Sequence, residues 1–193
     1  MHHRLLTFGP LLLAAGTALL LRVHGIGFGM PALLDPDEPW FVLKAFELLD
    51  QKTLNPNWFG HPASTIIYLL AGNHLFLFLT GWASGTYRDT AEFAASVFAD
   101  PSIVWVPARV IFAVIGTSVV LLTYLVARRL VGTGAALVAA ALVAVNALHV
   151  AWSQIIRTDI PSSLFMLITV LLALRYLQQQ QERRRDLIVA GLC

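Results

Sequence analysis

Acidic side chains gather in the stretch Leu34-Asp35-Pro36-Asp37-Glu38-Pro39-Trp40, which sets three carboxylates within four residues. Pro39 suits the first position of a helix, so Asp37 or Glu38 could cap that helix and place negative charge at its N-terminus. A cap needs one such side chain, and this turn carries three. A further carboxylate could serve as a general base that accepts a proton in a reaction. The turn is thus a helix cap, a reaction centre, or both.

Two other groups of residues could take part in chemistry. Arg157 and Asp159 lie in Ser-Gln-Ile-Ile-Arg-Thr-Asp-Ile-Pro, between two strongly apolar segments. They form either part of a site or an interfacial ion pair with a helix cap. His61, in Gly-His-Pro, is either a turn residue or a ligand to substrate. Four polar residues lie inside apolar segments, where we expect interhelical hydrogen bonds: Asn73, His74, Asn146 and His149.

The composition defines the class of protein that must position these residues. Hydrophobic residues make up 58% of the 193 residues, charged residues make up 12%, and the mean hydropathy is +0.73. Several apolar segments approach the ~20 residues that cross a bilayer, and only helices satisfy their own backbone there. The net charge of +2 gives no support to nucleic-acid binding. We therefore expect an all-α polytopic membrane protein.

Basic residues orient the membrane-spanning segments. Arg128-Arg129 and the triplet at 183–185 follow apolar segments, which predicts that both clusters are cytoplasmic. The turn around Arg157 then lies outside, as does the end of the first helix. The predicted spans are about 5–23, 104–127, 135–153 and 161–177.

The remaining segment, 24–103, is predicted to form a large first external loop. The apolar run 62–82 has both flanks outside, so we expect it to be docked at the surface or re-entrant, although a span stays open. Between Pro39 and Gln51 the polar residues are three and four apart and the rest are mostly apolar. This pattern predicts a helix in the membrane interface, which would place the acidic turn at headgroup level.

Three stretches resemble the N-terminal part of GT-C-fold glycosyltransferases, in particular the protein O-mannosyltransferase, ArnT and RgtA-like enzymes. DPDEPWFVLKAFEL resembles the Asp-Glu signature and juxtamembrane helix of the first external loop, and LNPNWFGHPASTIIYLL resembles a basic-Pro-Pro segment, with the second proline missing at Ala63. The stretch from Ala108 to Leu174 resembles paired helices with an Arg-x-Asp outer corner. The similarity covers about residues 5–180.

The resemblance implies a GT-C-type transmembrane helix bundle that moves a hexose or pentose, with inversion, from a polyprenyl-phosphate-linked donor to an acceptor hydroxyl. The acceptor would be a protein, lipid or glycan, at the extracytoplasmic face of the plasma membrane. In this scheme Asp37 is the base and Glu38 orients it or the acceptor, although these two roles could be exchanged. Arg157 and His61 would hold the phosphate, and Asp159 would position the arginine or the donor sugar. No cofactor is certain, and a divalent metal stays open.

The resemblance also leaves alternatives. A non-catalytic multi-pass protein, such as half of a transporter or a lipid-binding assembly partner, would carry similar intramembrane charges. The chain stops at Gly191-Leu192-Cys193, inside what looks like a further apolar helix. We therefore expect residues 1–193 to be the N-terminal part of a longer transmembrane domain, a part that could be inactive alone.

Overall fold

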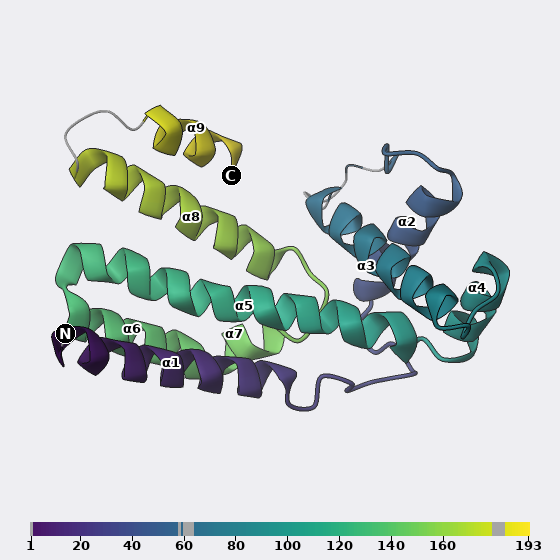
Figure 1. Cartoon of the computed structure of the whole chain (residues 1–193), viewed down its shortest axis with the longest axis horizontal. Helices are drawn as coiled ribbons and strands as arrows, with labels where there is room; N and C mark the ends of the chain where they lie inside the picture. The colour runs from purple at the N-terminus through teal and green to yellow at the C-terminus, as the bar shows by residue number, and fades with distance from the viewer. Residues whose placement is uncertain (1, 58, 60–63, 179–183) are drawn as a thin grey trace. The chain divides into compact units, whose positions relative to one another are not determined.

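A computed structural model describes residues 2–57, 59, 64–178 and 184–193 (Figure 1). The described residues form nine helices and no strand, which confirms the all-α prediction. The helices are α1 (His2–Val23), α2 (Glu38–Asp50), α3 (Ser64–Ala83), α4 (Thr90–Ala99), α5 (Ser102–Val131), α6 (Thr133–Val145), α7 (Ala147–Trp152), α8 (Asp159–Gln178) and α9 (Arg184–Leu192).

The chain divides into two compact units. The bundle unit comprises Met1–His24, Phe112–Gln154 and Asp159–Cys193, and the loop unit comprises Gly25–Ile111 and Ile155–Thr158. Helix α5 contributes its first residues to the loop unit and the rest to the bundle unit. Each unit has its own buried residues.

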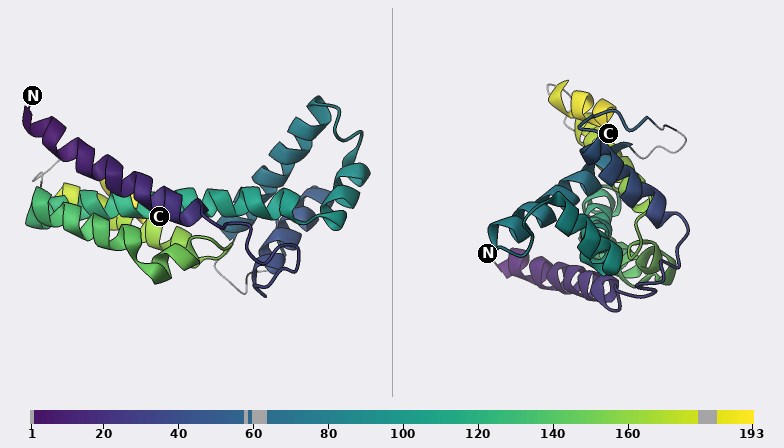
Figure 2. Two further views of the ribbon diagram at one scale, coloured as in Figure 1. Left: turned by 90° about the horizontal axis from the view of Figure 1, so that it is seen from below. Right: turned by 90° about the vertical axis from the view of Figure 1, so that its right-hand side faces the viewer.

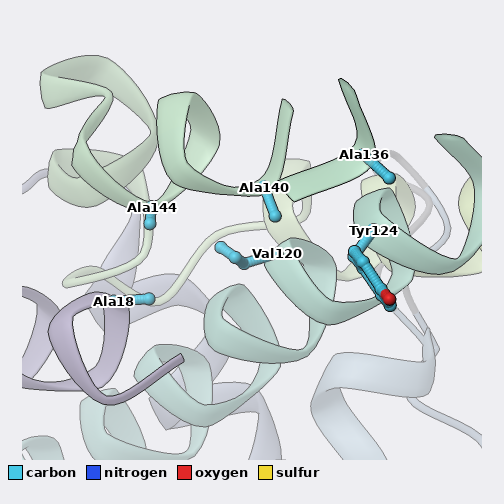
Figure 3. Packing of buried hydrophobic residues seen from close by; sticks show 6 residues of the cluster. All are labelled: Ala18, Val120, Tyr124, Ala136, Ala140 and Ala144. Atoms are coloured by element: carbon cyan, nitrogen blue, oxygen red, sulfur yellow. The ribbon is translucent and has the colours of Figure 1, made fainter. Parts of the chain in front are cut away.

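In the bundle unit, α1 lies along α6, drawn in purple and green in Figure 2. Small side chains make this packing close. Ala136, Ala140 and Ala144 recur every fourth residue on α6 and so share one face of that helix. They form a buried cluster with Ala18 of α1 and with Val120 and Tyr124 of α5 (Figure 3).

In the loop unit, α2 packs against α3. The inward face of α2 carries Phe41, Val42, Ala45 and Leu48, and that of α3 includes Ile66, Ile67 and Leu70. The His74 ring of α3 stacks on Phe46 at 4.1 Å between centroids, and its Nε2 lies 3.3 Å from the Val42 carbonyl. This is the interhelical hydrogen bond predicted for His74.

In the part of the chain that the structure describes, three helices are long and apolar enough to cross a membrane: Ser64–Ala83, Ser102–Val131 and Asp159–Gln178. The last two contain the predicted spans 104–127 and 161–177, and α1 contains 5–23. The segment 62–82, expected to be docked or re-entrant, includes a helix that by length and composition could also span. The expected span 135–153 is interrupted, because the backbone at Asn146 is extended and separates α6 from α7.

Candidate active site

Two turns that are far apart in the sequence meet in the loop unit. The Arg157 guanidinium lies 2.8 Å from Asp37 Oδ2 and 3.2 Å from Asp35 Oδ2, in both cases through Nη2. The exposed fractions of the side chains differ: 15% for Asp35, 22% for Arg157 and 49% for Asp37. One arginine therefore bridges two carboxylates, and Asp37 is the more open of the two.

The local fold explains how the acidic turn is held. Asp37 occupies the N-cap position of α2, but its side chain makes no capping hydrogen bond. The capping role belongs to Asp35, whose Oδ1 accepts the backbone N–H groups of Asp37 at 3.0 Å and Glu38 at 3.3 Å. The prediction that Asp37 or Glu38 supplies the capping side chain is thus wrong, because the turn brings the Asp35 carboxylate to these amides instead.

Glu38 has a different environment from that of Asp37. Its side chain is fully buried, and its carboxylate pairs in a bidentate manner with Arg109, at 2.6 and 2.9 Å. Glu38 Oε1 also accepts the backbone N–H of Ile156 at 2.9 Å. Charge-assisted bonds of this kind are short and strongly directional. Glu38 therefore fixes the turn that carries Arg157 to the turn that carries Asp37.

Arg109, on α5, was not predicted as a site residue. Besides Glu38, it donates to the carbonyls of Ile26 at 2.9 Å and Phe28 at 2.7 Å, and its guanidinium lies 4.6 Å from the centroid of the Phe28 ring. The sequence held one sign of this role, a single arginine inside an apolar segment. Such a charge is costly unless it is paired, so its presence indicates a buried partner. Arg109 joins the chain after α1, the acidic turn and the Arg157 turn into one network.

Of the two other predicted site residues, one belongs to the bundle unit and one lies outside the described residues. Asp159 is the exposed first residue of α8 and belongs to the bundle unit, and its backbone carbonyl accepts the Ser163 hydroxyl at 2.9 Å. His61 lies outside the described residues. The structure thus brings together Asp37, Glu38 and Arg157.

The outward face of α2 is apolar next to this site. Trp40 is 56% exposed and Leu43 is 59% exposed. On the polar stripe, Lys44 Nζ donates to Glu47 at 2.6 Å, and this hydrogen bond lowers the pKa of the Glu47 carboxyl. The helix therefore has the buried face, exposed apolar residues and short charged stripe expected of an amphipathic interfacial helix.

Among the described residues, no three His, Cys, Asp or Glu side chains lie close enough together to hold a metal ion. The carboxylates of the acidic turn are paired with arginines instead.

The helices and the paired charges define a class, that of all-α integral membrane proteins with a polar site beside an amphipathic helix. Comparison with known families narrows this class. The sequence model of the dolichyl-phosphate-mannose-protein mannosyltransferase family matches residues 90–193, more than half of the chain. The chain belongs to this family, and the prediction of a GT-C-type membrane glycosyltransferase is confirmed.

The matched region contains Arg109, Arg157 and Asp159 and begins after the acidic turn. No curated protein and no solved structure matches the chain.

Proposed function

We propose that this protein transfers a sugar from a polyprenyl-phosphate-linked donor to an acceptor hydroxyl, with inversion, at the extracytoplasmic face of the membrane. Membership of the mannosyltransferase family supports the reaction class. The observation that carries the proposal to particular residues is the ion pair between Arg157 and Asp37, at 2.8 Å. It brings together a carboxylate and a cation, which are the two kinds of group that this reaction needs.

Asp37 is the proposed base. In the reaction the acceptor oxygen attacks the anomeric carbon of the donor sugar, and the bond from that carbon to the phosphate oxygen breaks. The hydroxyl proton passes to the Asp37 carboxylate, and the phosphate leaves with the bonding electron pair. A carboxylate base on the face opposite the leaving group gives inversion. Asp37 suits this role because its side chain is 49% exposed, whereas Glu38 is fully buried.

Arg157 is the proposed partner of the leaving phosphate. The leaving group is already an anion, so it needs positive charge and hydrogen bonds rather than a general acid. A guanidinium presents several N–H groups in a fixed plane, which allows it to contact a carboxylate and a phosphate at once. His61 would add a further contact to the phosphate, and Asp159 would position the arginine or the donor sugar.

Glu38 and Arg109 are proposed to act as positioning residues. The Glu38 carboxylate is already bound by Arg109 and by the Ile156 amide, so it takes no part in proton transfer in this scheme. Its contribution is to hold the chain on both sides of the Asp37–Arg157 pair. A displacement of about 1 Å in such a pair can cost a factor of ~100 in rate.

The apolar face of α2 is proposed to guide the polyprenyl chain. Trp40 and Leu43 are exposed beside the acidic turn, so an isoprenoid chain could lie along them at the membrane interface. The predicted cytoplasmic position of Arg128-Arg129 supports an external position for the acidic turn. The phosphate of the donor would then lie at headgroup level.

A transfer assay tests the function. The full-length protein in nanodiscs would be supplied with a panel of polyprenyl-phosphate-linked hexoses and pentoses, and the product would be analysed by NMR for its anomeric configuration. We expect transfer from at least one lipid-linked donor, with the configuration inverted. Substrate flux into vesicles without any lipid-linked donor, together with no transfer, would contradict the proposal and identify a transporter.

A further inference from the structure

Helix α6 ends early inside an apolar part of the bundle unit. Asn146 has φ −63° and ψ 115°, and its Oδ1 accepts the His149 N–H at 2.9 Å, which caps the start of α7. Because the helix stops there, the last carbonyls of α6 lose the amides of a following turn. In apolar surroundings, backbone groups left without hydrogen bonds are costly, so a break at this depth needs other donors.

The Arg22 side chain of α1 supplies those donors. Nη1 donates to the Ala144 carbonyl at 3.1 Å and to Ala18 of its own helix at 2.9 Å, and Nη2 lies 3.3 Å from the Val143 carbonyl. Nη2 also lies 2.8 Å from His149 Nδ1, and Nε lies 3.3 Å from the Ser153 hydroxyl. All five N–H groups of the guanidinium are therefore used: four reach α6 and α7 on the two sides of the break, and one bonds to Ala18 of α1 itself.

These contacts indicate which nitrogen of the His149 imidazole carries a proton. A guanidinium only donates hydrogen bonds, so His149 Nδ1 must be the acceptor. The imidazole is then neutral and carries its proton on Nε2. A protonated imidazole would place a second cation against Arg22.

The C-terminal end of α6, which the break exposes to Arg22, also compensates part of the arginine's positive charge. The side chain is fully buried, and the acceptors that it contacts are neutral carbonyl, hydroxyl and imidazole groups. A buried cation is expensive, but here it lies at the C-terminus of α6, where the helix dipole is negative. Gly116 of α5 allows the close approach, because a Cβ there would lie 2.7 Å from Ser153 Cβ and 3.1 Å from Arg22 Nε.

We propose that Arg22 is a positioning residue that clamps the break between α6 and α7. Ser153, which the clamp holds at its far end, is followed after one residue by the turn 155–158 that carries Arg157. Fixing α7 thereby fixes the point from which this turn begins. The effect on catalysis rests on the proposed function, whereas the clamp itself does not.

Hydrogen exchange and transfer kinetics of the full-length protein test this inference. Arg22→Lys keeps the charge but replaces a planar fork of donors by a point charge that cannot span the same acceptors. We expect the amides of residues 147–153 to exchange about 10-fold faster or more, because opening of this segment becomes easier. We also expect kcat to fall about 10-fold while KM for the sugar donor changes less than about 3-fold, since positioning is lost rather than ground-state binding.

Three further variants separate the clamp from general damage. Gly116→Ala would disturb the same contacts without changing Arg22, so it should reproduce both effects. Ser153→Ala removes one acceptor and should give a smaller effect of the same kind. Arg128→Lys makes the same substitution at an exposed position and should change neither exchange nor kcat.

Wild-type exchange of residues 147–153 in Arg22→Lys would overturn the clamp. Faster exchange with unchanged kcat would overturn its positioning role. If the wild-type protein transfers no sugar, the proposed function fails, and the exchange data still decide whether Arg22 holds the break.

Discussion

Arg157 Nη2 lies 2.8 Å from Asp37 Oδ2, so a residue after α7 and a residue before α2 share one ion pair. Asp35 joins the same guanidinium at 3.2 Å. The arginine therefore balances part of the negative charge of the acidic turn. It also supplies positive charge at the place where, in the proposed reaction, the phosphate departs.

Arg157→Lys should lower sugar transfer about 100-fold, a loss typical of removing one well-placed donor to a developing anion. Lysine keeps the charge, but its single nitrogen would have to contact Asp35, Asp37 and the phosphate together, whereas the guanidinium has further N–H groups in a fixed plane. The measurement is kcat with a saturating lipid-linked donor, and Arg128→Lys is the control. Equal activity of Arg157→Lys and the wild type would remove Arg157 from the mechanism.

Glu38→Gln should act on stability first. The glutamine is nearly isosteric, but it leaves the buried Arg109 charge unpaired, which costs about 3–5 kcal/mol. We expect a clearly lower Tm in detergent by intrinsic fluorescence, whereas Asp37→Asn should leave Tm close to that of the wild type. If Arg109→Gln adds little to the loss in a double variant, the two residues act as one unit. A Glu38→Gln protein with unchanged Tm and no activity would instead give Glu38 a direct chemical role.

Two substitutions at Asp35 separate its capping role from its charge. Asp35→Asn keeps an oxygen that can accept the amides of Asp37 and Glu38, so it should preserve most of the stability of α2. Asp35→Ala removes the cap and should cost about 1 kcal/mol. The difference in Tm between the two variants measures the cap. A larger loss for Asp35→Asn than for Asp35→Ala would contradict this assignment.

Cysteine labelling in whole cells tests the predicted orientation. Residues 1–193 contain one cysteine, Cys193, so a full-length variant without cysteines, which includes Cys193→Ser, provides the background. Arg88→Cys should react with an impermeant maleimide from outside, and Arg129→Cys should react only after the membrane is opened, because Arg128-Arg129 are predicted to be cytoplasmic. Protection of residue 88 in intact cells would mean that α3 crosses the membrane.

Much of the architecture could be predicted from local patterns. The lengths of the apolar segments predicted the all-α class. The start of α2 was indicated by Pro39 and the acidic residues before it. The pairing of the acidic turn with Arg157 could not be derived, because it depends on tertiary contacts between segments more than a hundred residues apart. Topology indicated only that both turns lie on the same side.

The residues that were missed have a common physical cause. Arg109 and Arg22 are single arginines within or at the end of apolar helices, and their importance comes from partners that no local pattern identifies. Asn146 and His149 were expected to bond between helices. His149 does so through Arg22, whereas the Asn146 side chain caps its own chain and interrupts the helix.

The central claim is that Asp37 accepts the proton of the attacking hydroxyl, and one comparison tests it most directly. Asp37→Asn and Asp50→Asn make the same substitution at the site and at an exposed residue near the end of α2. In the full-length protein we expect Asp37→Asn to lower kcat about 10²–10⁴-fold, as for loss of a general base, with membrane insertion and Tm unchanged. Asp50→Asn should match the wild type. Full sugar transfer by Asp37→Asn would contradict the account.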